Sequence, residues 1–255
     1  ATKHDGLSYF IIDMKQPGVE TQPLKQMNGY ASFNQVFLTD AEVLPDFQVA
    51  ELGDGWKVAT TTLMHERRAA DSLRAWGQVP DTDGPIYDQE RAEVETTMAP
   101  YKWYPQRAGR VDLIMQRAKE TGAIKDPAVR QEIAKLMTLH KSAEWTARRA
   151  RSAQEQGKPQ GPEGSLGKLA ASNVARAAAK VHTMISGADS MLSGDDSPEN
   201  GTVAEVLISF PASSIAGGTD EIQKNIISER VLDMPKETRF DAGKPFKDIP
   251  RNTIS

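Results

Sequence analysis

The amino-acid sequence predicts a mainly α-helical fold with some β-structure near the start of the chain. Two long segments carry this prediction, because residues 127–156 repeat apolar residues at helical intervals and residues 165–191 form an alanine-rich run. Alanine every three or four residues permits close packing of neighbouring helices. We therefore expect these two segments to form the core of a helical bundle.

The other expected elements follow one another along the chain. Residues 7–13 and 33–38 are rich in β-branched and aromatic residues, and both are predicted strands. Gly55 begins a helical pattern that glycines and prolines interrupt within residues 77–85. A further helix is expected over residues 111–120, followed by a Thr-Gly stop.

The long helix expected from residue 127 has a clear start signal. Asp126 supplies a capping side chain, and Pro127 occupies the first helical position. Its expected buried face consists of Val129, Ile133, Leu136, Met137, His140 and Ala143. Residues 157–164, which contain two prolines, are expected to form the loop to the alanine-rich helix.

Composition excludes several function classes. The 31 basic and 35 acidic residues give a net charge of -4, which argues against a general nucleic-acid binder. There is no cysteine, so disulfides and thiolate chemistry are excluded, and we predict a cytoplasmic location. No apolar run is long enough to span a membrane. Since 38% hydrophobic residues is a low fraction, part of the apolar surface is expected to face a partner.

A glycine turn precedes a capped helix near the end of the chain. Gly217 and Gly218 allow the backbone to approach a ligand closely, and Thr219 can cap a helix whose free amides suit a phosphate. Alone, such a turn is ordinary and has no functional meaning. In sequence, however, residues 215–230 resemble the active-site loop and following helix of acyl-CoA dehydrogenases.

Further motifs in the same order extend this resemblance over nearly the whole chain. It is weakest between about residues 75 and 125. The matching segments are Pro17-Gly18-Val19, Asn34-Gln35-Val36-Phe37-Leu38-Thr39-Asp40, Val43-Leu44-Pro45, Gly53-Asp54-Gly55-Trp56-Lys57-Val58-Ala59, residues 163–169 and residues 229–237.

The resemblance implies a C-terminal helical bundle of the acyl-CoA dehydrogenase type preceded by a partial β-domain. The implied domains are residues 1–52 for the end of the β-domain, 53–235 for the bundle and 236–255 for a tail. Family members usually start with a helical domain and a complete β-domain. We therefore expect the chain to be a C-terminal fragment or one piece of a split protein, and the isolated fragment to be inactive.

The family removes two hydrogens from an acyl-CoA thioester, with FAD as hydride acceptor and a carboxylate as general base. Many members carry the base as a glutamate at the position of Gly217, so the usual base is absent here. A subset supplies it from the first helix of the bundle, where Glu66 lies seven residues after Ala59. The alternative is that Glu66 is a solvated residue paired with a neighbouring arginine.

Other site residues follow from the same resemblance. Met64, His65 and Arg67 lie where the family contacts acyl-CoA, and Gly217 and Gly218 should face the substrate.

Flavin contacts are implied for Thr219 and Glu221, although a carboxylate near a pyrophosphate is electrostatically unfavourable. The family's Arg-x-x-Phe-Gly segment has no counterpart between Gln78 and Gly109, and the glycine-rich segment is reduced at residues 185–189. Half of the expected FAD contacts are thus lost or altered.

The leading hypothesis is an FAD-dependent acyl-CoA dehydrogenase with Glu66 as base. The alternative is a non-catalytic structural subunit of a heteromeric acyl-CoA dehydrogenase. Either protein is expected to form homo- or hetero-oligomers, with an electron acceptor that the sequence does not identify. No metal site is predicted, because the four histidines lack paired ligand spacing.

Overall fold

A computed structural model of the chain describes residues 4–76, 81–158, 161–239, 241 and 243–249, without the side chains of 67–76 and 163. These residues form two compact units. Unit 1 contains residues 1–25, 31–99 and 237–255, and unit 2 contains residues 26–30 and 100–236. The domain boundaries expected after residues 52 and 235 stay a prediction, because compact units need not coincide with domains.

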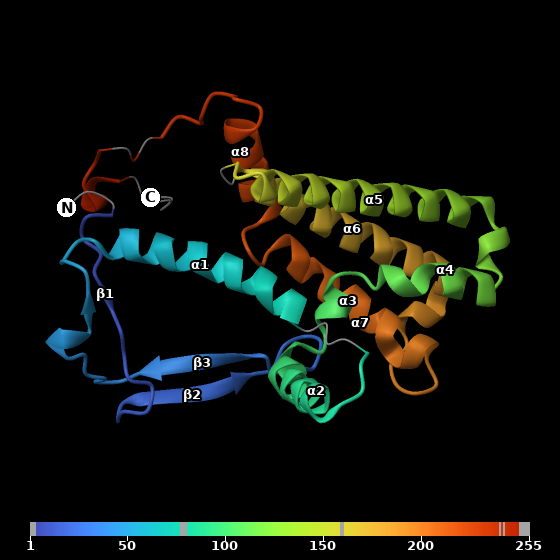
Figure 1. Cartoon of the computed structure of the whole chain (residues 1–255), viewed down its shortest axis with the longest axis horizontal. Helices are drawn as coiled ribbons and strands as arrows, with labels where there is room; N and C mark the ends of the chain where they lie inside the picture. Colours follow the sequence, from blue (N-terminus) through green and yellow to red (C-terminus); the bar gives the residue numbers. More distant parts are fainter. Residues whose placement is uncertain (1–3, 77–80, 159–160, 240, 242, 250–255) are drawn as a thin grey trace, which may run out of the picture. The chain divides into compact units, whose positions relative to one another are not determined.

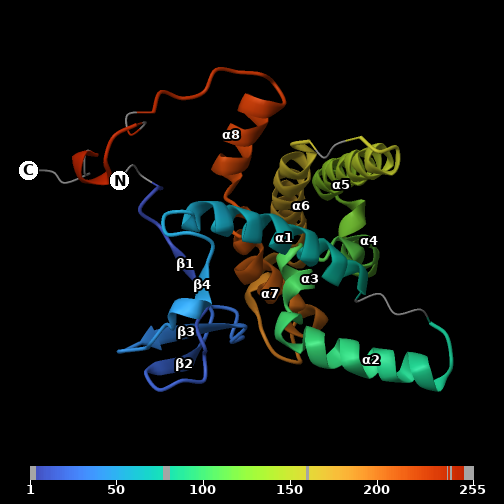
Figure 2. The same ribbon diagram turned by 60° about the vertical axis from the view of Figure 1, so that its left-hand side comes forward.

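Unit 1 holds the β-structure of the described residues and two helices. Its elements are β1 (Tyr9–Phe10), β2 (Val19–Leu24), β3 (Phe33–Leu38), η1 (Pro45–Phe47), β4 (Gln48–Val49), α1 (Gly55–Trp76), α2 (Pro85–Met98) and η7 (Phe246–Asp248). Strands β2 and β3 form an antiparallel hairpin that pairs Val19 with Leu38 (Figure 1), and β1 pairs with β4 (Figure 2).

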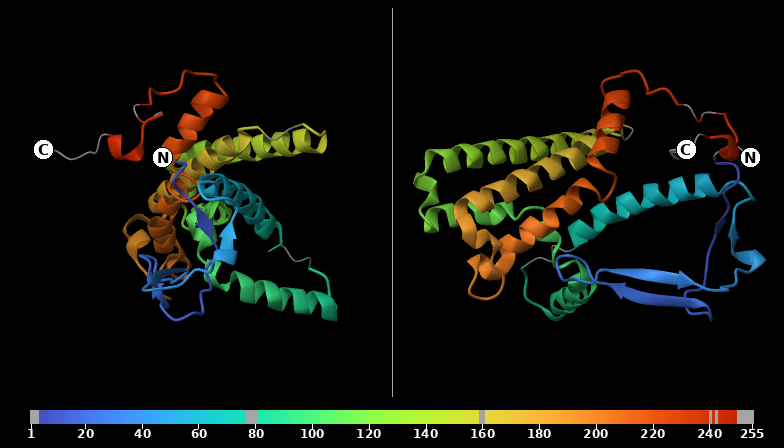
Figure 3. Two further views of the ribbon diagram at one scale, coloured as in Figure 1. Left: turned by 90° about the vertical axis from the view of Figure 1, so that its left-hand side faces the viewer. Right: turned by 180° about the vertical axis from the view of Figure 1, so that it is seen from behind.

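Unit 2 is helical. Its elements are α3 (Tyr104–Arg107), α4 (Val111–Glu120), η3 (Ala123–Lys125), α5 (Pro127–Glu155), α6 (Glu163–Ser186), η4 (Gly187–Met191), η5 (Pro198–Gly201), α7 (Thr202–Ser209), η6 (Phe210–Ser214) and α8 (Asp220–Arg230). The 3-10 helix η2 (Ala99–Tyr101) crosses the boundary of the two units. Helices α5 and α6 lie side by side along most of their length (Figures 1 and 3).

The core of unit 2 lies between α4, α5 and α6. Its fully or nearly fully buried side chains are Ile114, Ala118, Val129, Ile133, Leu136, Val174, Ala178, Val181 and Ile185. Those of α5 and of α6 recur at intervals of three or four residues, so each helix presents one apolar stripe to the other. The mainly α-helical fold and the predicted bundle are therefore confirmed.

Local signals explain where the bundle helices begin and end. The Oδ1 atom of Asp126 accepts a hydrogen bond from Ala128 N at 2.7 Å, which confirms the predicted cap of α5. Helix α6 ends earlier than predicted, at Ser186, because Gly187 adopts a φ of +58° and the chain continues as 3-10 helix. Helix α4 and strand β3 have the predicted bounds.

Unit 1 has one strand shorter than predicted and two elements that were not predicted. Of residues 7–13, only Tyr9–Phe10 form a strand, because the partner strand β4 is also two residues long. Strand β2 was not expected, since its sequence is polar and contains a proline. The helical pattern of α1 does end before Gly84-Pro85, but the helix α2 that begins at Pro85 was not expected; a proline is favourable at this first helical position.

Candidate functional site

The glycine turn joins η6 to α8 in unit 2. Gly217 and Gly218 have φ values of +72° and +95°, a region that glycine enters without steric strain. The hydroxyl of Thr219 then accepts a hydrogen bond from Ile222 N at 3.3 Å, so Thr219 is the N-cap of α8. The expected turn and capped helix are thus both present.

The two glycines have different surroundings. A Cβ atom at Gly217 would meet no other atom within 4 Å, whereas one at Gly218 would lie 2.6 Å from Gln223 Nε2. The buried side chain of Gln223 donates from Nε2 to the carbonyl oxygen of Gly217 at 3.2 Å. The turn therefore folds back on its own helix, and a side chain at Gly218 would require the end of the Gln223 side chain to shift.

Three side chains of α6 form one polar face toward the turn. Lys168, Ser172 and Arg176 are spaced by four residues, which places them on the same side of a helix. Asp220, whose side chain is 7% exposed, lies 3.5 Å from Lys168 Nζ and 3.0 Å from an Arg176 guanidinium nitrogen. A buried carboxylate thus binds α8 to α6, and α8 crosses α6 at this place (Figures 1 and 2).

The charge of Asp220 is stabilised by these partners. Burial by itself raises the pKa of this carboxyl group. Hydrogen bonds from neighbouring side chains, that of Arg176 at 3.0 Å among them, together with the positive charge of Lys168, outweigh burial and lower the pKa of Asp220 to about 2. The carboxylate is therefore ionised at any physiological pH.

The remaining predicted residues of the turn and of α1 are on the surface. Glu221 is exposed on the first turn of α8. Met64, His65 and Glu66 are exposed on α1 in unit 1, and the side chain of Arg67 lies outside the described residues. Because α1 and the glycine turn belong to different units, the meeting of Glu66 with Gly217 stays a prediction.

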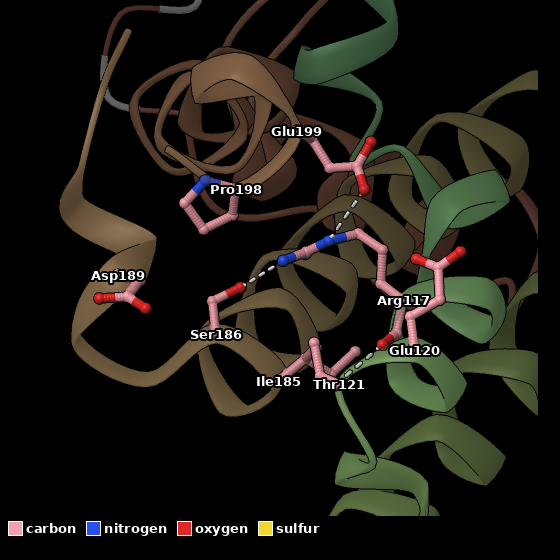
Figure 4. Close-up of a pocket in the computed structure, with 8 residues that line it drawn as sticks. All are labelled: Arg117, Glu120, Thr121, Ile185, Ser186, Asp189, Pro198 and Glu199. Carbon is pink, nitrogen blue, oxygen red and sulfur yellow. Dashed lines mark hydrogen bonds and ion pairs between the residues drawn. The ribbon is translucent and has the colours of Figure 1, made fainter. Parts of the chain in front are cut away.

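A second polar cluster in unit 2 surrounds a cavity of about 440 Å³. Its lining residues are Arg117, Glu120, Thr121, Ile185, Ser186, Asp189, Pro198 and Glu199. The buried guanidinium of Arg117 lies between Ser186 Oγ at 2.6 Å and Glu199 Oε1 at 3.4 Å (Figure 4). Three carboxylates face one cation here, so the local charge does not favour a phosphate ligand.

His182 connects this cluster to the start of α4. Its Nε2 lies 3.1 Å from the Gly109 carbonyl oxygen and therefore carries the proton, while Nδ1 accepts a hydrogen bond from Arg117 at 3.0 Å. Burial and the neighbouring charge of Arg117 lower the pKa of His182. The ring is thus a neutral structural hydrogen-bonding group.

Within the described part of the chain, neither a metal-binding cluster nor a membrane-spanning helix occurs. There, no group of three or more His, Cys, Asp or Glu side chains has a geometry that could hold a metal ion. No helix among those residues combines the length and apolar character needed to cross a membrane.

Comparisons with known proteins agree with the fold and the turn. The family model of the acyl-CoA dehydrogenase C-terminal domain matches residues 107–232, which include η6, the glycine turn and α8. Residues 107–232 of the chain therefore belong to the acyl-CoA dehydrogenase family, as its C-terminal domain.

Individual relatives give the extent of the match. Acyl-CoA dehydrogenase IpdE1 of Mycobacterium tuberculosis is 29% identical over 243 residues, which cover 93% of this chain and 53% of that protein. The same-named protein of Mycolicibacterium smegmatis is 30% identical over 240 residues, covering 93% and 51%. The chain thus spans about half the length of these relatives.

Solved structures share the fold. One described as "Tcur3481-Tcur3483 steroid ACAD" has a TM-score of 0.69 at 19% identity, and the match covers 93% of this chain and 54% of that one. The ChsE4-ChsE5 complex from Mycobacterium tuberculosis has a TM-score of 0.64 at 20% identity, with 92% and 54% covered. At such identities the similarity supports the fold alone.

The sequence did not single out Asp220, Gln223 or the polar face of α6. The spacing of Lys168, Ser172 and Arg176 by four residues was a usable signal, because such spacing on an alanine-rich helix marks a polar stripe. Asp220 directly follows the predicted cap, where an acidic residue is ordinarily interpreted as a favourable interaction with the helix dipole. Its burial depends on the neighbouring helix.

Proposed function

We propose that this chain takes part in FAD-dependent α,β-dehydrogenation of an acyl-CoA thioester, with Glu66 as the general base. The observation that carries the proposal is the turn at Gly217 and Gly218, joined to the capped start of α8 in a domain of this family. A glycine at the usual base position leaves Glu66, at the alternative family position, to accept the α proton.

The neighbours of Glu66 would bind the substrate. Met64 and His65 are exposed within one helical turn of Glu66, so they are accessible to a ligand on the same part of α1. Arg67 would contact a phosphate or carbonyl oxygen of acyl-CoA. Gly217 and Gly218 would admit the thioester close to the backbone, since neither carries a side chain.

The flavin would contact the start of α8. Thr219 uses its hydroxyl for Ile222 N, and the other first-turn amides of α8 suit a pyrophosphate oxygen. Glu221 fits less well, because its exposed carboxylate would repel a phosphate. When bound, FAD supplies the acceptor for the substrate hydride.

A bulky acyl group is the substrate class that we favour. The space beside Gly217 is open, because no other atom lies within 4 Å of the place that a Cβ atom would occupy there. A structure with the same fold carries the description "steroid ACAD", which names a large, rigid substrate class. We therefore expect ring-bearing acyl-CoA thioesters to be oxidised faster than short linear ones.

A second candidate is a non-catalytic subunit of a heteromeric acyl-CoA dehydrogenase. Two similar structures are named as pairs of different chains, Tcur3481 with Tcur3483 and ChsE4 with ChsE5. In this case the chain would contribute structure to an oligomer, and a partner would contribute the base and the flavin. A cytoplasmic location is part of both proposals.

The two candidates differ in the effect of Glu66→Gln. This change keeps size and hydrogen bonding but removes the proton acceptor, so turnover of an acyl-CoA with an artificial electron acceptor should fall at least ~10²-fold. Glu95→Gln is the matched control, because Glu95 is also an exposed glutamate on a helix of unit 1. Its turnover should equal that of the unmodified protein.

Flavin absorbance in the purified protein completes the test. Flavin bands together with loss of turnover in Glu66→Gln support the catalytic proposal. Normal turnover in Glu66→Gln contradicts the assignment of the base, whereas a purified full-length protein with neither flavin bands nor turnover supports the non-catalytic subunit.

A further inference from the structure

We propose that Asp220 is a positioning residue that holds both ends of the glycine turn on α6 through Lys168, Ser172 and Arg176. The relevance of this turn to the reaction rests on the proposed function. The anchoring itself depends only on the described contacts of unit 2.

The chain before the turn is attached to α6 by three side chains. The carbonyl oxygen of Ser213 accepts hydrogen bonds from Lys168 Nζ at 2.5 Å and from Ser172 Oγ at 2.7 Å. Arg176 donates to Ser214 Oγ at 2.9 Å. The last residues of η6 therefore cannot move away from α6 without breaking charge-assisted hydrogen bonds.

The chain after the turn is attached to the same face of α6. One carboxylate oxygen of Asp220 accepts a hydrogen bond from Lys168 Nζ at 3.5 Å, and the other accepts one from Arg176 at 3.0 Å. Each of the two cations thus contacts the chain on both sides of residues 215–219. Because both ends are bound to one rigid helix, the turn between them has a defined position.

Burial makes this attachment stronger than a surface ion pair. The side chain of Asp220 is 7% exposed and that of Lys168 is 19% exposed. Removing one partner of a buried pair leaves the other charge without compensation, whereas exposed pairs contribute little. Loss of the Asp220 charge should therefore loosen the turn and leave the cations of α6 without their partner.

Amide hydrogen exchange of the purified chain tests the anchor without any ligand. The informative amides are hydrogen bonded within or beside the turn: Ile215, Ala216, Ile222 and Gln223. In Asp220→Asn, which keeps the side-chain size, their exchange should be at least about 10-fold faster. Leu136 in the core of α5 reports global opening, and its exchange should not accelerate by the same factor.

Glu132→Gln is the matched control. Glu132 forms ion pairs with Lys135 and, across the two long helices, with Lys180 at 2.8 Å. Because both lysines are exposed, loss of this network should leave the four turn amides unchanged. Unchanged turn exchange in Asp220→Asn, or equal acceleration of the turn and of Leu136, overturns the proposal.

If Asp220→Asn does not fold, Arg176→Gln tests the anchoring of the glycine turn in its place. Arg176 is half exposed, so its removal should be tolerated, and the turn amides should still exchange at least about threefold faster. Unchanged exchange in this variant overturns the proposal.

Measurements of kcat and KM distinguish a failure of the proposed anchor from a failure of the proposed function. In a protein that oxidises acyl-CoA, loosening the turn should lower kcat more than it changes KM, because the turn positions reacting groups. A protein without flavin or turnover that still shows faster turn exchange in Asp220→Asn would retain the anchor and contradict the proposed function.

Discussion

The two units of the chain differ in how they bury their apolar side chains. Among the described residues, every buried hydrophobic side chain lies in unit 2. In unit 1, large apolar side chains remain exposed even on regular elements, including Phe33 at 50% in the hairpin and Trp56 at 47% on α1. Unit 2 therefore has a hydrophobic core of its own, whereas the described side chains of unit 1 form none.

This difference separates the two parts of the proposed site. The glycine turn is bound to the well-packed unit 2 through buried charges, so its shape is determined within that unit. Glu66 is exposed on α1 of unit 1, and the described side chains of that unit form no hydrophobic core. A turn that is positioned in advance and a base that depends on its surroundings should respond differently to substitution.

The largest expected effect is on the core of unit 2. Leu136 is fully buried, and Leu136→Ala should lower the free energy of unfolding by about 2–5 kcal/mol, because it removes contacts and leaves a cavity. Leu63 on α1 is 46% exposed, so Leu63→Ala should cost below about 1 kcal/mol. Denaturant unfolding measures both. Equal losses would show that the two units are packed equally well.

Alanine substitutions of the two turn glycines should have smaller effects on the free energy of unfolding, and the two effects should differ. Alanine at either position is strained by the positive φ, at about 1–3 kcal/mol. Gly218→Ala should cost more than Gly217→Ala, because its Cβ would displace the buried amide of Gln223. Thermal unfolding of the two variants measures this order. A lower midpoint for Gly217→Ala would contradict the described turn.

Lowering the pH should decrease the free energy of unfolding of unit 2 in two pH ranges. The pKa of His182 is lowered by burial, so the unfolded chain binds a proton more readily below about 6.5, and stability is lost as the pH falls through that value. The pKa of Asp220 is about 2 in the fold, so its contribution is lost from about pH 4 down to about 2. Unfolding free energy measured against pH should fall in both ranges.

Histidine variants test the first of these ranges. His182→Gln should remove the dependence near pH 6.5, because glutamine does not titrate. His140 was expected on the buried face of α5 but is exposed, and His140→Gln should leave the pH dependence unchanged. If the pH dependence of stability disappears in His140→Gln and persists in His182→Gln, the effect does not come from His182.

The smallest effect is expected for exposed charges of α5. Glu144 pairs with Lys141 and Arg148 within the same helix, at 2.8 and 2.6 Å. Both cations are largely solvated, so Glu144→Gln should leave the thermal unfolding midpoint nearly unchanged. A shift as large as that of Asp220→Asn would show that burial does not distinguish the two networks.

Local signals predicted much of the helical unit. Asp126 and Pro127 marked the start of α5, and Thr219 marked the start of α8, because a helix start is determined by side chains that cap its own amides. The same reasoning missed α2, whose first proline also resembles a break. It missed β2 as well, since polar strands carry a weak pattern.

By itself, the sequence determined the helical class, the main helix limits, the family resemblance and the residues of the glycine turn. These features depend on periodicity, caps and motifs, all of which are local in the chain. Only the tertiary structure showed that Asp220 is buried against Lys168 and Arg176, some 50 residues away in the sequence. Whether a charge is solvated or anchors a turn depends on which helix packs over it, and that packing is a property of the folded chain.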